Sequence, residues 1–313
     1  MTKKSIILDC DPGQDDAVAI LLALASKDDI DVLGITTVAG NVPLNLTESN
    51  ARRICELAGR SDIKVFAGAS QPLMRKLVTA EWIHGKTGID GADLPDPSMA
   101  LQEAHAVSFI VETCLAAEDS SITICPIGPM TNVALAMMQS PQIIPKIREI
   151  VCMGGAVKEL GNTTPAAEFN IYVDPQAAKV VLESGVPFTM MPLDVTHKAL
   201  VTPARLQNFK DLNSPVGNAC GGMLDFFNRF DMTRYGFDGG PLHDPCVIAY
   251  LIDPEIFSGR KVHLDIEVTS ELTMGQTVAD WWDVEEKTPN AYICDDLDSD
   301  RFFKLLTSRL ALL

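Results

Sequence analysis

The first two thirds of this 313-residue chain alternate between short apolar runs and longer segments of helical pattern. An apolar run at residues 5–8 precedes a segment at 15–26 with acidic residues in its first turn, and the pattern returns at 31–38 and 44–57. Short, nearly uninterrupted apolar runs are typical of strands that are buried on both faces. The alternation therefore predicts an α/β fold with a mostly parallel central sheet and helices on both faces.

This pattern continues to about residue 200 and then changes. Further strands are expected at residues 63–66, 121–127, 148–153 and 187–191, and helices at 104–116, from Thr131 onward and at 174–184. A loop rich in Gly, Pro and Asp is expected at 68–103. The C-terminal part is predicted to be largely helical, with antiparallel strands at 262–269 and 277–280 and a last helix at 299–312 whose N-cap is Ser299. No repeat, low-complexity segment or linker is found, so we expect one domain, 1–313.

Charge and cysteine content exclude several classes of protein. The formal net charge is −17, which argues against nucleic acid and anionic membrane surfaces as partners, because both attract clustered Lys and Arg. No stretch approaches the roughly 18 apolar residues of a membrane span, and the segment before Asp9 is too short for the apolar region of a signal peptide. The eight cysteines form no C-x-x-C pair, which indicates free thiols in a reducing compartment. We therefore expect a cytoplasmic protein that binds neither nucleic acid nor membrane.

The densest chemical signal lies between the first strand and the first helix, where Asp9, Asp11, Asp15 and Asp16 fall within eight residues. Ligand sites of open α/β sheets lie at the carboxyl ends of the strands. Asp9 and Asp11 can face one side of an extended segment, and the turn that follows can return Asp15 or Asp16 toward them. A helix-dipole role would explain the last two but not the first two. Converging carboxylates need a cation, and oxygen ligands select calcium or magnesium.

Two other carboxylate motifs are weighed against this interpretation. An EF-hand loop starting at Asp9 would need Gly and Glu at the positions held by Gln14 and Ile20. A phosphatase of the haloacid-dehalogenase type also places D-x-D after its first strand, but usually carries Thr or Val where this chain has Gly13. A magnesium-dependent phosphatase is therefore the alternative from a different class.

Two further groups of polar residues lie later in the chain. His243, Asp244 and Pro245 precede an apolar run, and Asp244 would also suit the N-cap of a helix that starts there. Asn162, Glu168 and Asn170 are bunched in one segment, which suits the recognition of hydroxyl groups but is also compatible with an ordinary loop.

Together these motifs resemble the inosine-uridine-preferring nucleoside hydrolase family over essentially the whole chain. The D-x-D-P-G-x-D-D signature stands at residues 9–16 and is highly specific. The other matching segments are residues 37–41, 84–85, 88–91, 127–132, 153–155, Asn162, 168–170 and 243–244. The resemblance implies a Rossmann-like nucleoside hydrolase fold in a single domain with a helical C-terminal half.

The resemblance also implies an activity and its cofactor. The reaction would be hydrolysis of the N-glycosidic bond of ribonucleosides to base and ribose, with an oxocarbenium-like transition state. A preference for pyrimidine ribonucleosides is expected, with broad purine and pyrimidine specificity as the alternative. One Ca²⁺ per subunit would be held by Asp9, Asp11, Asp16, Asp244 and the backbone carbonyl of Ile127.

Residue roles follow from the same resemblance. Asp11 would be the general base, and His84 and His243 would be the other catalytic side chains, lining the base pocket. Residues 231–237 should overhang that pocket. The substrate contacts would come from Asp15, Asn41, Met153, Asn162, Glu168, Asn170 and Tyr235. The other three histidines, His105, His197 and His263, are interpreted as structural or surface residues, and the family implies a homo-oligomer, either a tetramer or a dimer.

Overall fold

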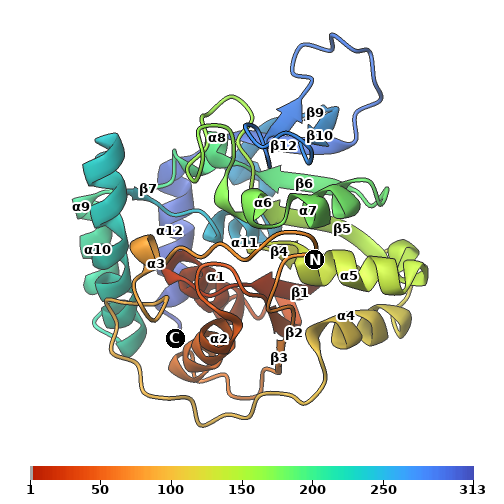
Figure 1. The fold of residues 1–313 in the computed structure, drawn as a ribbon. Coiled ribbons are helices and arrows are strands. Elements are labelled where there is room, and N and C mark those ends of the chain that lie inside the picture. Colours follow the sequence, from red (N-terminus) through yellow and green to blue (C-terminus); the bar gives the residue numbers. More distant parts are fainter. Residues whose placement is uncertain (1–2) are drawn as a thin grey trace.

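A computed structural model describes residues 3–313, apart from the side chain of Asp231. Its centre is an eight-stranded sheet with helices on both faces (Figure 1). Seven neighbouring strands run parallel, and only the edge strand β9 is antiparallel to its neighbour β12. In spatial order the strands are β3 (Val65–Ala67), β2 (Ile30–Thr37), β1 (Lys4–Cys10), β4 (Ile122–Pro126), β5 (Ile147–Met153), β6 (Phe188–Met191), β12 (Ala291–Leu297) and β9 (Phe257–Val262). The predicted mostly parallel α/β fold is confirmed.

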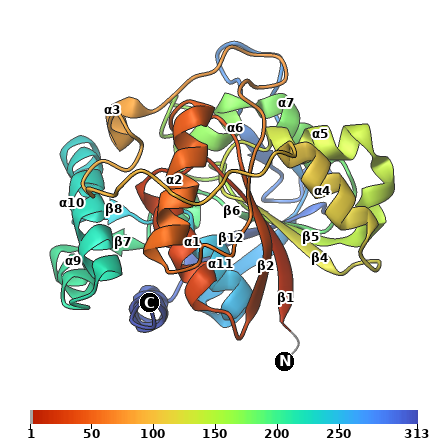
Figure 2. The same cartoon turned by 90° about the horizontal axis from the view of Figure 1, so that it is seen from below.

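Two groups of helices cover the sheet, and Figure 2 shows β1 and β2 between them. Their apolar faces form two separate clusters of buried side chains. One face carries α1 (Gln14–Ala25), α2 (Leu44–Leu57), α10 (Pro215–Tyr235), α11 (Pro245–Ile252) and α12 (Ser299–Leu310). The other carries α4 (Ala106–Leu115), α5 (Thr131–Gln139) and α7 (Pro175–Leu182).

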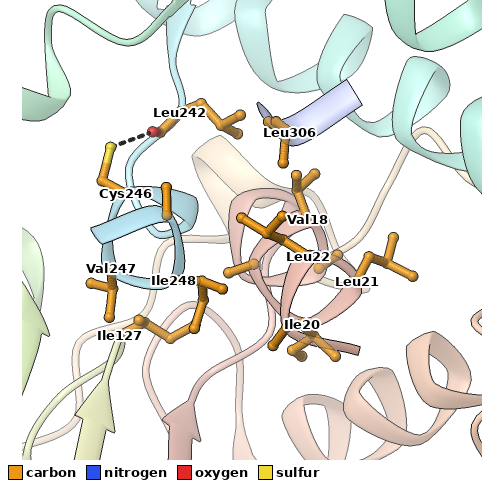
Figure 3. Close-up of a cluster of buried hydrophobic side chains, with 14 of the residues drawn as sticks. Val18, Ile20, Leu21, Leu22, Ile127, Leu242, Cys246, Val247, Ile248 and Leu306 are labelled. Carbon is orange, nitrogen blue, oxygen red and sulfur yellow. Dashed lines mark hydrogen bonds between the residues drawn. The ribbon is translucent and has the colours of Figure 1, made fainter. Parts of the chain in front are cut away.

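Helix α1 is buried along its whole length, because α2, α10, α11 and α12 all pack around it. Figure 3 shows Val18 and Leu22 of α1 among Leu242, Ile248 of α11 and Leu306 of α12. A helix enclosed on every side cannot shift without disturbing the close-packed core. Its first turn, which carries the acidic signature, is therefore held rigidly against the end of β1.

The remaining elements are short and border the sheet. They are α3 (Glu81–His84), α6 (Phe169–Val173), α8 (Leu193–Thr196), β7 (Leu200–Val201), α9 (Pro203–Lys210), β8 (Gly240–Pro241), β10 (Leu264–Ile266) and β11 (Thr277–Ala279), with 3₁₀ turns at Pro141–Lys146 and Pro254–Ile256. No helix in the described part of the chain is both long enough and apolar enough to cross a bilayer.

The sequence predictions fail mainly near the C-terminus. The strand expected at 262–269 is divided between the end of β9 and β10, and β10 pairs antiparallel with β11 as expected. The sequence analysis did not predict strand β12. Asp295 and Asp296 interrupt its apolar run, and its partners β6 and β9 are distant in sequence. The last helix is capped by the Asp298 carboxylate, which accepts from Arg301 N–H, and not by Ser299. The segment 68–103, which was expected to be a loop, contains the short helix α3, and this helix carries His84.

Candidate active site

The acidic signature lies at the point where the strand order reverses. From β1 the chain passes to β2 and β3 on one side, and then returns to β4 on the other side of β1. Asp9 is paired in register with Thr36 on β2 and Pro126 on β4, close to the carboxyl ends of all three strands. Such a switch point opens a crevice in which α/β proteins bind their ligands.

Asp16 folds the turn after β1 back onto itself. One of its carboxylate oxygens accepts the Asp11 N–H at 3.1 Å, and the other accepts the Gly13 N–H at 2.9 Å and the Asn41 side-chain amide at 3.1 Å. These bonds satisfy backbone donors at the start of α1. Asp16 therefore has a capping role and also brings its carboxylate beside Asp11.

The Asp11 carboxylate lies in a narrow space between two glycines. A Cβ at either Gly40 or Gly128 would overlap one of its oxygens, so both positions require glycine. Oδ2 accepts the Asn41 N–H at 2.7 Å, whereas Oδ1 is buried and has no hydrogen-bond partner among the described residues. A buried carboxylate oxygen without a donor is costly unless a cation or ligand proton meets it.

The Asp9 carboxylate, like that of Asp11, has one oxygen that is hydrogen-bonded and one that is not. Its Oδ1 accepts from the Thr36 hydroxyl at 2.5 Å and the Asn132 side-chain amide at 2.8 Å, while its buried Oδ2 has no partner within the described chain. Asn132 is itself fixed, because its Oδ1 accepts the Ala69 N–H at 2.8 Å. Sequence reasoning did not assign Thr36 or Asn132 a role, although both lie in or next to segments that matched the family.

Asp244 reaches the cluster from the other end of the chain. It occupies the N-cap position of α11 but makes no capping hydrogen bond with its side chain, so the capping interpretation fails. Its carboxylate instead joins those of Asp15 and Asp16, with one oxygen from each lying within 4.8 Å of the others. All three side chains are buried.

Burial and mutual repulsion govern the ionisation of these groups. Burial raises the pKa of Asp9 to about 7 and that of Asp16 to about 6. Burial, together with neighbouring carboxylates, raises the pKa values of Asp11 and Asp244 well above their usual range. Such a group of carboxylates stays ionised only when a cation offsets the charge. The unpartnered oxygens and the all-oxygen donor set fit a hard divalent cation.

A pocket adjoins the carboxylates. Its walls include most of the residues expected at the site: Asp15, Asn41, His84, Ile127, Met153, Asn162, Glu168, Asn170, Tyr235, His243 and Asp244. Asp9, Asp11 and Asp16 are not among its lining residues and are buried behind it. Side chains that were not expected also line it: Ala80, Ile83, Phe169, Phe227 and Phe230.

One wall of the pocket is polar and firmly braced. The Glu168 carboxylate accepts from the N–H groups of Gly155, Asn170 and Ile171, and its burial raises its pKa to about 7. The Asn170 amide donates to the carbonyls of Ile127 and Met153 at 2.9 and 3.2 Å. Since a carbonyl has two lone pairs, that of Ile127 retains one for a further partner. Amide and carboxylate groups held in this way are suited to bind hydroxyls.

Another wall of the pocket is aromatic. The ring of His84 stacks on Phe227 with centroids 5.4 Å apart, and Phe227 meets His243 edge-on at 6.5 Å. Burial lowers the pKa of His84 to about 3 and that of His243 well below its usual range, so both rings are neutral. Tyr235 lines the pocket, while the Asp231 side chain at the start of the same segment lies outside the described residues.

The three histidines interpreted as structural have different surroundings. His105 caps α4, since its ring nitrogen accepts the Val107 N–H. The ring of His263 lies 3.1 Å from the Thr288 carbonyl, away from the pocket. His197 packs behind the aromatic wall, with its ring centroid 6.0 Å from that of His243 and 6.4 Å from that of Tyr235.

A switch-point pocket backed by buried carboxylates defines an α/β enzyme with a carboxylate-centred active site. The model of the inosine-uridine preferring nucleoside hydrolase family matches residues 6–304, and the chain belongs to that family. This confirms the family inferred from the motifs and the expectation that the chain is a ribonucleoside hydrolase.

Relatives and solved structures agree with this assignment over the full length. The chain is 50% identical to an uncharacterized protein of Schizosaccharomyces pombe, covering 97% of this chain and 98% of the relative. It is 45% identical to the pyrimidine-specific ribonucleoside hydrolase RihA of Klebsiella pneumoniae, covering 98% of each chain. The structure of the purine-preferring ribonucleoside hydrolase from Gardnerella vaginalis matches with a TM-score of 0.91 and 32% identity over 98% of each chain.

Proposed function

We propose that this chain cleaves the N-glycosidic bond of pyrimidine ribonucleosides in a calcium-dependent reaction, releasing free base and ribose. The observation that carries the proposal is the pair of buried, unpartnered carboxylate oxygens on Asp9 and Asp11 beside a pocket with a polar and an aromatic wall. The polar wall suits a sugar, and the aromatic wall suits a base.

The proposed metal ligands are Asp9, Asp11, Asp16, Asp244 and the Ile127 carbonyl. Several carboxylates and a carbonyl match the six to eight oxygens that calcium takes, whereas magnesium usually binds one or two carboxylates. When bound there, calcium would neutralise the carboxylates, engage ribose hydroxyls and acidify the attacking water.

Asp11 is the proposed general base. Its Oδ2 is held by the Asn41 N–H, which leaves Oδ1 as the oxygen that takes a proton from water. The carboxylate occupies space that a Cβ at Gly40 or Gly128 would fill. A base that is held within reach of its water contributes typically 10²–10⁴ in rate.

The polar wall is proposed to hold the ribose through Asp15, Asn41, Met153, Asn162, Glu168 and Asn170. Because Glu168 and Asn170 are fixed by backbone groups, they can meet the sugar hydroxyls without rearranging. Positive charge that develops on the sugar in an oxocarbenium-like transition state would be stabilised by the surrounding carboxylates.

His84, His243 and Tyr235 are proposed to surround the base. A pyrimidine preference is supported by the similarity to RihA, a protein named as pyrimidine-specific. The structural neighbour named as purine-preferring keeps broad specificity as the alternative. The magnesium-dependent phosphatase is set aside by the family match.

The compartment and the assembly are also proposals. All eight cysteines are buried free thiols, which supports a cytoplasmic enzyme. The homo-oligomer rests on the family resemblance alone.

The direct test is a panel of ribonucleosides, assayed for free ribose with calcium and again with a chelator. We expect ribose release from uridine and cytidine that stops when calcium is removed. Phosphate release from phosphate monoesters with magnesium, and no ribose from any nucleoside, would contradict the proposal.

A further inference from the structure

The Gln14 side chain contacts both the ring and the backbone carbonyl of His84. The Gln14 amide nitrogen lies 2.9 Å from the His84 carbonyl and 3.1 Å from the Asp90 carbonyl. The amide oxygen lies 2.7 Å from Nδ1 of the His84 ring. Gln14 is completely buried. The contacts also tie the loop after α3 to the first turn of α1.

The two carbonyls fix which way the Gln14 amide faces. Carbonyl oxygens only accept hydrogen bonds, so the group that faces both of them must be the NH₂ end. The oxygen end then faces the His84 ring and can only accept. His84 Nδ1 must therefore carry a proton and donate it. A neutral imidazole has one N–H, which leaves Nε2 with a lone pair that can accept a hydrogen bond.

The His84 ring is held in place from other directions as well. It stacks on Phe227, and a Cβ at Gly13 would collide with Nδ1, so the ring occupies space that only glycine leaves open. Nδ1 is engaged by Gln14, His84 lines the pocket, and Nε2 has no protein partner among the described residues. Burial lowers the pKa of His84 to about 3, so the ring does not gain a second proton near neutral pH.

We propose that Gln14 is a positioning residue that fixes His84 as the Nδ1–H tautomer, so that Nε2 accepts a hydrogen bond from an N–H or O–H of the bound nucleoside. In this state His84 orients the substrate and does not protonate the leaving base. The part that concerns the substrate rests on the proposed ribonucleoside hydrolysis, whereas the tautomer does not.

The tautomer can be measured without any reaction. The full chain, with its five histidines labelled with ¹⁵N, would be examined by long-range ¹H–¹⁵N correlation, and the His84 signals assigned by their loss in His84→Asn. We expect a protonated Nδ1 and an Nε2 with the shift of an unprotonated nitrogen. A protonated Nε2, alone or together with Nδ1, would overturn the proposal.

Three variants separate the tautomer from general loosening of the loop. Gln14→Met keeps the length of the side chain but removes the acceptor, so both tautomers should become populated. Gln14→Glu, whose carboxyl group burial would keep protonated, retains a donor toward the two carbonyls and an acceptor opposite Nδ1, and should keep the wild-type signature. Asn50→Leu is the matched control, because Asn50 donates to the Pro12 and Thr87 carbonyls in the same region without contacting the His84 ring. An unchanged signature in Gln14→Met, or the loss of the signature in Asn50→Leu, would refute the role of Gln14.

Two uridine analogues identify the substrate donor. 3-Methyluridine lacks the base N–H, and 5′-deoxyuridine lacks the 5′-hydroxyl. One of them should lose roughly tenfold in kcat/KM relative to uridine in the wild type, the value of one hydrogen bond, and this difference should disappear in Gln14→Met but persist in Gln14→Glu. If the differences are the same in all three proteins, Nε2 is not a substrate acceptor. If no nucleoside is cleaved at all, the proposed function fails while the tautomer is still decided by its own spectrum.

Discussion

Replacement of Asp9 by Asn should change how the stability of the metal-free protein depends on pH. Burial raises the pKa of Asp9 to about 7, from an ordinary value of 3.8. Between these values the folded state holds a proton that the unfolded state has released. The contribution of Asp9 to the free energy of unfolding is therefore fully present below about pH 4 and is lost as the pH rises through about 7. The interval of about three pH units, at about 1.4 kcal/mol for each, amounts to about 4 kcal/mol.

The Asp9→Asn variant retains an acceptor for the Thr36 hydroxyl and the Asn132 amide, but it does not titrate. Its free energy of unfolding should therefore fall by about 4 kcal/mol less than that of the wild type between pH 4 and pH 8. Asp16 and Glu168 also have raised pKa values near 6 and 7, but they are present in both proteins, so the difference between the two curves reports Asp9.

Urea unfolding at a series of pH values, in the presence of a chelator, measures both curves. Parallel curves for the wild type and Asp9→Asn would refute the reasoning. Saturating calcium should flatten the wild-type curve, because a bound cation replaces the proton and stabilises the folded state. The variant should gain less stability from calcium than the wild type does.

Other outcomes test the metal, the sugar and the base separately. Asp16→Ala should lower the thermal unfolding temperature and abolish the stabilisation by added calcium, because metal binding is linked to folding; an unchanged calcium response in a thermal unfolding assay would exclude Asp16 as a ligand. 2′-Deoxyuridine should have a kcat/KM lower than that of uridine by roughly 10⁴, since a site built for a hydroxyl rejects an analogue that lacks it; comparable values in a ribose-release assay would remove the assigned sugar contacts. Uridine and cytidine should be cleaved faster than inosine, and a purine preference of about tenfold or more, which corresponds to about 1.4 kcal/mol, would reverse the proposed base preference.

The sequence indicated the first six strands well because each is a short apolar run, and most of them alternate with helices of clear period. Helix α2 was predicted with the bounds that the structure has, Leu44–Leu57. Strand β12 has no such signal. It follows a polar segment, and it is a strand because β6 and β9 flank it, which depends on parts of the chain more than 28 residues away. Local patterns carry no information about that kind of pairing.

The site was predictable to the extent that its residues cluster in short motifs. The acidic signature predicted the convergence of Asp11 and Asp16, whose main-chain and side-chain groups are bonded. The family resemblance was needed to place Asp244 with them, because nothing in its local sequence separates a metal ligand from a helix cap. Phe227 and Phe230 lie on α10, where the sequence shows only a helical pattern, and their place in the pocket depends on how α10 packs. Gln14 could not be assigned a partner before the position of α3 was known.

Asp11→Asn tests the central claim most directly. The substitution keeps the size of the side chain and an acceptor for the Asn41 N–H, but it removes the group that takes a proton from water. Uridine hydrolysis would be measured at saturating calcium, with calcium and substrate binding followed by titration calorimetry. We expect both ligands to bind while kcat falls by roughly 10²–10⁴. A near-normal kcat with calcium bound would show that Asp11 is not the base.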